Sequence, residues 1–163
     1  MDKIDMTFME MVRFDAGDAR RIQHFTKVHA YAHLIGAAEG LDEKTQQTLE
    51  LAAVVHDIGI IPAEKKYGYQ NGKIQEEMGP ALAIELLERV GIEKDVIERV
   101  AFLVAHHHTW KGVDSVDWQI LLEADFLVNS LEKGMAINTI ENTMNKLFKT
   151  EAGIQLCKEM YGL

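Results

Sequence analysis

The spacing of apolar residues constrains the fold of this chain more than any other feature of its sequence. Hydrophobic side chains recur three and four positions apart along nearly its whole length, which is the period of an amphipathic α-helix. Only 2 prolines in 163 residues interrupt that period, so most segments have room for long helices. The pattern therefore predicts an all-α fold, a compact helical bundle of about six to eight helices.

Capping residues and helix breakers place the expected helices along the chain. Asp18 and Asp42 precede two of them as N-caps, and Gly40 ends the first of these. Residues 60–75 lose the helical period, so we expect a long loop there, and long loops in compact domains often carry function. Pro80 suits the first turn of the next helix. The predicted helices cover about residues 8–12, 19–39, 43–58, 80–90, 94–108, 116–131, 137–147 and 154–163.

Length and composition indicate one globular domain. Hydrophobic residues make up 47% of the chain and charged residues 26%, an ordinary mixture for a globular protein. A chain of 163 residues suits a single hydrophobic core. No apolar run approaches the ~20 residues of a membrane-spanning helix. We therefore expect one domain over residues 1–163 and no association with a membrane.

Charge and cysteine content narrow the class of partner and compartment. The net charge of −9 disfavours nonspecific binding to the phosphate backbone of nucleic acids. The single cysteine, Cys157, cannot form an internal disulfide, which is consistent with a reducing cytoplasm. Residues 1–5 lack the basic-then-apolar order of a signal peptide. We expect a cytoplasmic protein that does not bind nucleic acid.

A histidine and an aspartate stand together at the end of a strongly apolar helix. His56 and Asp57 follow the run Leu51–Val55. Burying an imidazole beside a carboxylate is costly unless both are satisfied, and a divalent cation satisfies both. On its own, the pair is also explained by a helix C-terminus with a solvated aspartate.

Two further polar residues interrupt apolar helix faces elsewhere in the chain. His24 shares a stripe with Val28 and Ile35 that should face the core. Asp125 lies in the middle of an apolar helix, where an acid rarely stands without a partner. Together with His56 and Asp57, these residues offer two imidazoles and two carboxylates from three helices, a donor set suited to an octahedral metal site with open positions for water.

With these residues the chain resembles the HD-domain metal-dependent phosphohydrolases. That family carries a first histidine, an adjacent His-Asp pair and a distant aspartate. This sequence has His24, then AAVVHDIG at residues 52–59, then EADFL at residues 123–127. The resemblance covers His24 to Leu131. It implies an HD-type helical fold with its motif core at about residues 18–131 and C-terminal helices at 135–163 packed on it. The metal ligands it implies are His24, His56, Asp57 and Asp125.

The resemblance also implies a reaction. It is the hydrolysis of a phosphomonoester or phosphodiester of a small molecule, above all a nucleotide, by attack of a metal-bound hydroxide. A divalent metal lowers the pKa of its bound water toward neutrality, and Asp57 is expected to orient that water or accept its proton. Mn, Fe, Ni, Co and Zn all suit these donors, and Mg is possible.

Three consecutive histidines close the helix predicted to end near the site. Some HD subfamilies hold a second metal with histidines here, but they supply another histidine shortly before the glycine that opens the preceding helix. Residues 75–79 contain none. His106 and His107 are therefore candidates to line the pocket as phosphate binders, proton donors or weak second-metal ligands, whereas His108 is expected to cap the helix or face solvent.

Each of several other ionisable residues allows two interpretations, one structural and one functional. His29 and His33 have the i, i+4 spacing of a helical zinc pair. They lie about 140° and 180° around the helix from His24, so we expect surface or packing roles. Lys65, in the expected loop, is a candidate to contact a phosphate as a point charge, as is its neighbour Lys66, or else a solvated charge. Glu123, Glu76 and Asn129 are weaker candidates for contact with substrate or with a metal ligand.

Two other functions would use the same residues. An iron-dependent oxygenase on this fold would need extra histidine ligands for a second iron, which residues 75–78 do not supply. A nucleotide-binding regulatory module without turnover would keep the metal site, because a fold does not by itself assign an activity. In each case the expected partner is a small molecule, most simply a phosphorylated one, and the oligomeric state stays open.

Overall fold

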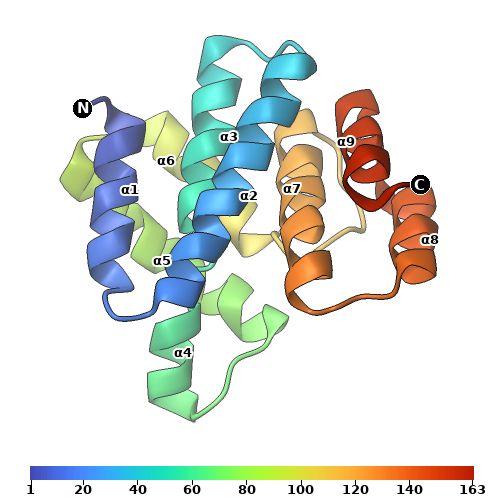
Figure 1. The fold of residues 1–163 in the computed structure, drawn as a ribbon. Coiled ribbons are helices and arrows are strands. Elements are labelled where there is room, and N and C mark those ends of the chain that lie inside the picture. The colour runs from blue at the N-terminus through green and yellow to red at the C-terminus, as the bar shows by residue number, and fades with distance from the viewer.

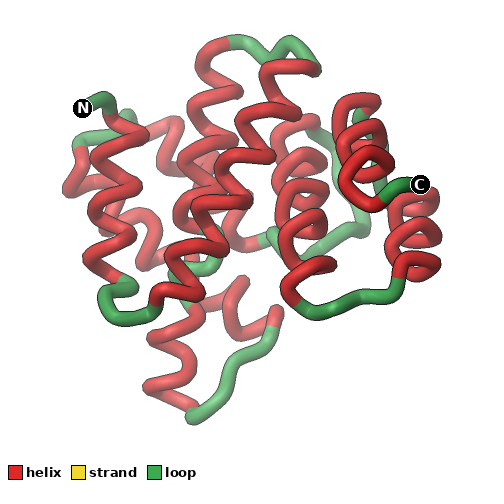
Figure 2. Tube along the Cα trace, in the orientation of Figure 1, coloured by secondary structure: helices red, strands yellow, loops and turns green.

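Nine α-helices and no strand make up the computed structural model, which describes all 163 residues (Figures 1 and 2). The all-α prediction is confirmed, with one helix more than the expected range of about six to eight. None of the helices is long and apolar enough to cross a lipid bilayer. The helices are α1 (Lys3–Phe14), α2 (Ala19–Ala38), α3 (Glu43–Val55), α4 (Ile60–Tyr67), α5 (Gly72–Val90), α6 (Lys94–Ala105), α7 (Val116–Glu132), α8 (Ile137–Leu147) and α9 (Glu151–Tyr161).

The predicted loop over residues 60–75 is wrong, because most of that segment is helical. Pro62 lies in the first turn of α4, where its missing N–H has no intrahelical partner to lose. Buried Ile60 and Ala63 hold α4 on the core. Gly68, with a left-handed φ of 76°, ends the helix, so the connection to α5 is short.

The start predicted for the next helix is also wrong. α5 begins at Gly72, where the Asn71 side chain accepts a hydrogen bond from the backbone N–H of Ile74. The helix then runs through Pro80, because α5 packs along α6 over its length and retains its other backbone hydrogen bonds. The sequence signal at Pro80 marked a position inside the helix rather than its first turn.

Helix α3 lies at the centre of the bundle, and this position accounts for the apolar residues in its C-terminal half. It packs against α1, α2, α6 and α7, and every residue from Thr48 to His56 is buried (Figure 1). A helix that is surrounded in this way needs apolar residues on all sides. The run Leu51–Val55 therefore continues the core to the end of α3, and it delivers His56 into the interior.

The turn after α3 is held tightly against α5. A Cβ atom at Gly59 would lie 3.1 Å from the backbone nitrogen of Gly79 and 3.2 Å from the carbonyl oxygen of Gln75. Only a residue without a side chain allows the two backbones to approach so closely. This contact fixes the position of the Asp57 backbone relative to α5.

The C-terminal helices are anchored by a buried carboxylate on α7. Glu123 is fully buried and accepts hydrogen bonds from the backbone N–H groups of Lys149 and Thr150, the Thr150 hydroxyl and the Gln119 amide. These contacts fasten the start of α9 to α7. The prediction that Glu123 contacts substrate or a metal ligand is wrong, since all its partners belong to this anchor.

Candidate metal centre

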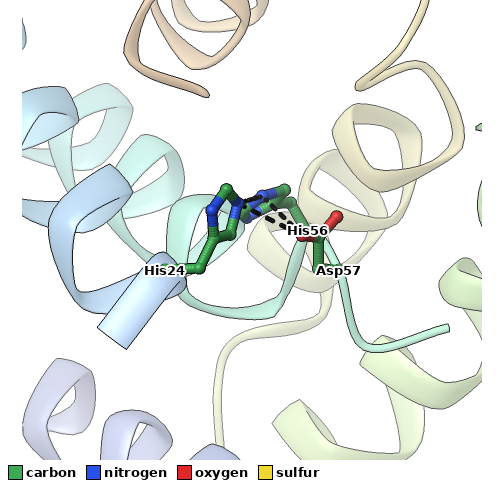
Figure 3. A group of neighbouring side chains, drawn as sticks. All are labelled: His24, His56 and Asp57. Carbon is green, nitrogen blue, oxygen red and sulfur yellow. Dashed lines mark hydrogen bonds and ion pairs between the residues drawn. The ribbon is translucent and has the colours of Figure 1, made fainter. Parts of the chain in front are cut away.

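Three helices bring the predicted ligands to one end of the bundle. His24 lies in the second turn of α2, Asp125 in the middle of α7, and His56 and Asp57 directly follow α3. α2 packs against both α3 and α7, so its buried face meets the other two at this point. Figure 3 shows the His24 ring, the His56 ring and the Asp57 carboxylate turned toward one another.

The donor atoms lie at distances that suit a shared cation. Nε2 of His24 is 3.3 Å from Nε2 of His56, 3.1 Å from Oδ1 of Asp125 and 3.2 Å from Oδ2 of Asp57. Nε2 of His56 is 3.4 Å from the same Asp57 oxygen and 3.3 Å from the same Asp125 oxygen. Ligands bound about 2.0–2.2 Å from one ion are themselves about 3 Å apart. The sequence thus grouped these four residues as the structure does.

Hydrogen bonds behind the rings fix which nitrogen faces the cluster. Nδ1 of His56 lies 2.7 Å from the carbonyl oxygen of Ala53, which can only accept, so Nδ1 carries the proton. Nδ1 of His24 lies 3.1 Å from Oε1 of Glu132, which fixes that ring in the same way. In their neutral forms, both rings therefore aim the lone pair of Nε2 at carboxylate oxygens.

Glu132 is a site residue that was not predicted from the sequence. Besides holding His24, its Oε1 atom lies 3.0 Å from Nζ of Lys27, so one carboxylate links the two side chains. A signal was present in the sequence, because Glu132 follows Asp125 by seven residues and Lys27 follows His24 by three. Those spacings return to the same helix face.

The electrostatics of the cluster demand positive charge. Burial lowers the pKa of His24, but hydrogen bonds with Asp125 and Asp57 outweigh it and raise the pKa to about 9. Burial likewise opposes the shift at His56, but the two aspartates outweigh it and raise the pKa of His56. Burial acts to raise the pKa values of Asp57 and Asp125, but the two histidines, with His107 in the case of Asp57, outweigh it and lower them. Protons on the imidazoles or a bound cation can supply that charge, and the donor set fits a divalent transition metal.

The other side-chain oxygen of Asp57, Oδ1, faces two of the three consecutive histidines. Oδ1 of Asp57 is 3.3 Å from Nε2 of His107, whose Nδ1 is held by the carbonyl oxygen of Val104 at 2.6 Å. Asp57, His107 and His108 have donor atoms within 4.8 Å of one another. His107 therefore lines the site as expected. His108 is exposed, as expected for a residue facing solvent, but its ring also reaches this group, which was not predicted.

The side chain of Gln75 contacts the rings of both His107 and His108; residues 75–79, where a further histidine would be needed for a second metal, contain none. Its side-chain oxygen is 3.2 Å from Nε2 of His107 and 2.6 Å from Nε2 of His108. Gln75 is buried, and it was missed because nothing in the α5 sequence distinguishes it from a surface glutamine. An amide oxygen thus stands beside the two imidazoles.

Two predicted site residues are not brought to the cluster. The His106 ring stacks on Phe102 with centroids 4.2 Å apart, and its Nδ1 lies 2.7 Å from the Phe102 carbonyl oxygen. The indole N–H of Trp118 donates to the His106 carbonyl. His106 therefore packs between aromatic residues, and its predicted pocket-lining role is wrong. Lys65 lies exposed on α4 and makes no ion pair with another residue.

Comparison with known proteins gives two matches. A family model described as the HD domain matches residues 21–141. A solved structure, that of a predicted HD superfamily hydrolase from an uncultured Thermotogales bacterium, is 23% identical, with a TM-score of 0.67 over 98% of this chain and 83% of that chain. No curated protein sequence matches significantly. The structural match shows that the helices are arranged in the HD-type fold.

Proposed function

The chain belongs to the HD domain family, and from this premise we propose that it is a phosphohydrolase that cleaves a phosphomonoester or phosphodiester of a small molecule, most simply a nucleotide. One observation carries the proposal. The Nε2 atoms of His24 and His56 converge on oxygens of Asp57 and Asp125 at 3.1–3.4 Å, and no lysine or arginine pairs with these oxygens. His24, His56, Asp57 and Asp125 would hold the cation.

A divalent cation bound there would supply an acidified water and a positive charge for a phosphoryl oxygen. The protein supplies the positioning. The Oδ2 atom of Asp57 faces His24 and its Oδ1 atom faces His107. Asp57 would therefore accept the proton of the attacking water. The backbone carbonyl of Val104 fixes the His107 ring with Nε2 forward, and that nitrogen would hold the proton that the leaving oxygen needs.

The surface on the His24 side suits a small anionic substrate. A cleft of about 320 Å³ opens beside Glu132 and is lined by Arg20, Gln23 and Lys27. Arg20 and Lys27 are four residues before and three residues after His24, so they share its side of α2. Glu132 lines the same cleft and pairs with Lys27, so Arg20 is the cation that would attract a phosphate there despite the net charge of −9. We keep Lys65 as a second candidate for that contact.

The alternatives predict different outcomes of one experiment. Metal-stripped protein is reloaded separately with Mn, Fe, Ni, Co and Zn, its metal content is measured by elemental analysis, and each form is assayed against phosphomonoesters, phosphodiesters and nucleotides. The proposal expects metal-dependent release of phosphate or of a nucleoside monophosphate. Asp57→Asn should lose both metal and activity, whereas Asp114→Asn, at an exposed aspartate, serves as the matched control.

Activity that survives in metal-depleted Asp57→Asn would contradict the proposal. A nucleotide that binds tightly and is recovered unchanged would instead identify a regulatory module. Oxygen consumption by the iron form without phosphate release would identify an oxygenase, which is disfavoured because Gln75 offers an amide oxygen where a further imidazole would be needed.

A further inference from the structure

A second group of histidines lies on the side of α2 away from His24. Nε2 of His29 is 2.9 Å from Oε2 of Glu50, and Nδ1 of His33 is 2.7 Å from Oε1 of the same carboxylate. The amide nitrogen of Gln46 donates to Oε1 as well, at 2.7 Å. We call these four residues, His29 and His33 from α2 and Gln46 and Glu50 from α3, the Glu50 cluster.

The carboxylate of this cluster is buried without a permanently charged partner. Glu50 is only 6% exposed, and its only ion pairs are those with the two histidines. Burial acts to raise its pKa, but hydrogen bonds from His29, Gln46 and His33 outweigh burial and lower the pKa to about 2. The group is therefore a buried anion at neutral pH.

The cluster also has more acceptors than donors. The amide nitrogen of Gln46 serves both Glu50 and the carbonyl oxygen of His33, which fixes the orientation of the amide. The amide oxygen of Gln46 is then buried without any hydrogen-bond partner. It is pressed against Gly36, where a Cβ atom would lie 2.3 Å away. Buried acceptors without donors are rare and costly, so the hydrogen bonding of this cluster is incomplete.

We propose that His29, His33 and Glu50 form a second site for a divalent transition-metal ion, zinc in the first instance, separate from the HD centre. Histidines four residues apart on a helix present their rings on one face, and a carboxylate from the neighbouring helix completes a His₂Glu set. Each imidazole already has one nitrogen next to an oxygen of that carboxylate, at 2.9 Å for His29 and 2.7 Å for His33.

Binding requires one movement, and the structure leaves room for it. Each imidazole now bonds its own oxygen of Glu50, with ring centroids 6.5 Å apart. The His33 side chain is 54% exposed, so it can turn toward the His29 ring without disturbing the core. Each ring then binds the ion through the nitrogen that now bonds Glu50, and its proton moves to the other nitrogen. The ion would fasten α2 to α3, the helices that carry His24 and lead to His56.

The test counts zinc ions in the full-length protein. Wild type, His33→Gln and His29→Gln/His33→Gln are equilibrated at the same buffered free zinc concentration, and bound zinc is measured by elemental analysis. Wild type should hold one more zinc per chain than the double variant. The nitrogen NMR signals of His29 and His33 should shift with that ion. Glutamine keeps a hydrogen-bond donor for Glu50, and exposed His33 can be replaced without a threat to folding.

Two results would overturn the proposal. One is equal zinc content in wild type and the folded His33→Gln and double variants. The other is an extra zinc in wild type that leaves the His29 and His33 signals unmoved. Because the comparison is a difference between variants with an intact HD centre, failure of the proposed phosphohydrolase activity would leave its outcome unaffected.

Discussion

Removing the metal should make the stability of this protein strongly dependent on pH between 6.5 and 9. In the metal-free protein, a proton on His24 must balance the charge of Asp57 and Asp125. Burial lowers the pKa of His24, but hydrogen bonds with these two aspartates outweigh it and raise the pKa to about 9 from its ordinary 6.5. A histidine whose pKa is higher in the folded state binds its proton more tightly there than in the unfolded chain. Its stabilisation is therefore complete below pH 6.5 and is lost as pH rises through 9.

The magnitude follows from the size of the shift. Each pKa unit corresponds to about 1.4 kcal/mol, so a shift from 6.5 to about 9 contributes about 3 kcal/mol to the free energy of unfolding. In a domain of 163 residues, 1 kcal/mol moves the melting temperature by about 2–4 °C. The melting temperature of the metal-free protein should thus fall by about 6–12 °C between pH 6 and pH 9.5. His56, whose pKa is also raised, acts in the same direction.

Thermal melts followed by circular dichroism test this reasoning. Chelator-treated protein is melted at intervals from pH 6 to 9.5, beside protein saturated with manganese and beside metal-free His24→Gln. The loaded protein should keep its melting temperature, because a cation balances the carboxylates when protons leave. The variant should lose most of the pH dependence. A metal-free melting temperature that stays constant across this range would refute the charge balance derived for the cluster.

Three further predictions concern carboxylates outside the four-residue cluster. Burial, with repulsion from Asp18 and Asp57, raises the pKa of Asp15 to about 6. The metal-free protein should therefore lose stability from about pH 4 to 6, and Asp15→Asn should gain about 1–2 kcal/mol at pH 8 and nothing at pH 4 in thermal melts. Glu123→Gln should lower the free energy of unfolding by about 1–3 kcal/mol in urea titrations, because it leaves buried donors short of an acceptor. Glu132→Ala should weaken metal binding by about 10–100-fold in calorimetry, and Glu132→Gln by less, because glutamine keeps an acceptor for His24.

The sequence predicted the class of fold and the centre of the site for the same reason. Periodic apolar residues mark helix faces that must be buried, and a polar residue on such a face stands out against them. His24 and Asp125 were found in this way, as interruptions of faces that the structure buries. The helix α4 was missed because residues 60–75 lack the helical period of apolar residues, although Pro62 is compatible with the first turn in which it lies.

Other parts of the site could not be predicted from the local sequence pattern. The contact between Gln75 and the rings of His107 and His108 joins residues more than thirty positions apart, and it depends on how α5 packs against α6. His106 and His107 are adjacent in sequence, yet one ring packs on Phe102 and the other faces Asp57. That choice is made by the turn at the end of α6, which sequence periodicity does not describe.

The same helix that builds the core also links folding to the charge balance of the candidate metal centre. Because the run Leu51–Val55 at the end of α3 is apolar and surrounded by other helices, it can only be buried, and the residue that follows it, His56, is carried to 0% exposure. Two carboxylates meet it there, and their desolvation opposes folding unless positive charge is present. A cation that binds the folded state alone adds RT ln(1 + [L]/Kd), about 2.7 kcal/mol at a hundredfold excess over Kd. Folding and loading of the centre are therefore linked, and metal-depleted protein should be the less stable form at every pH at which His24 is neutral.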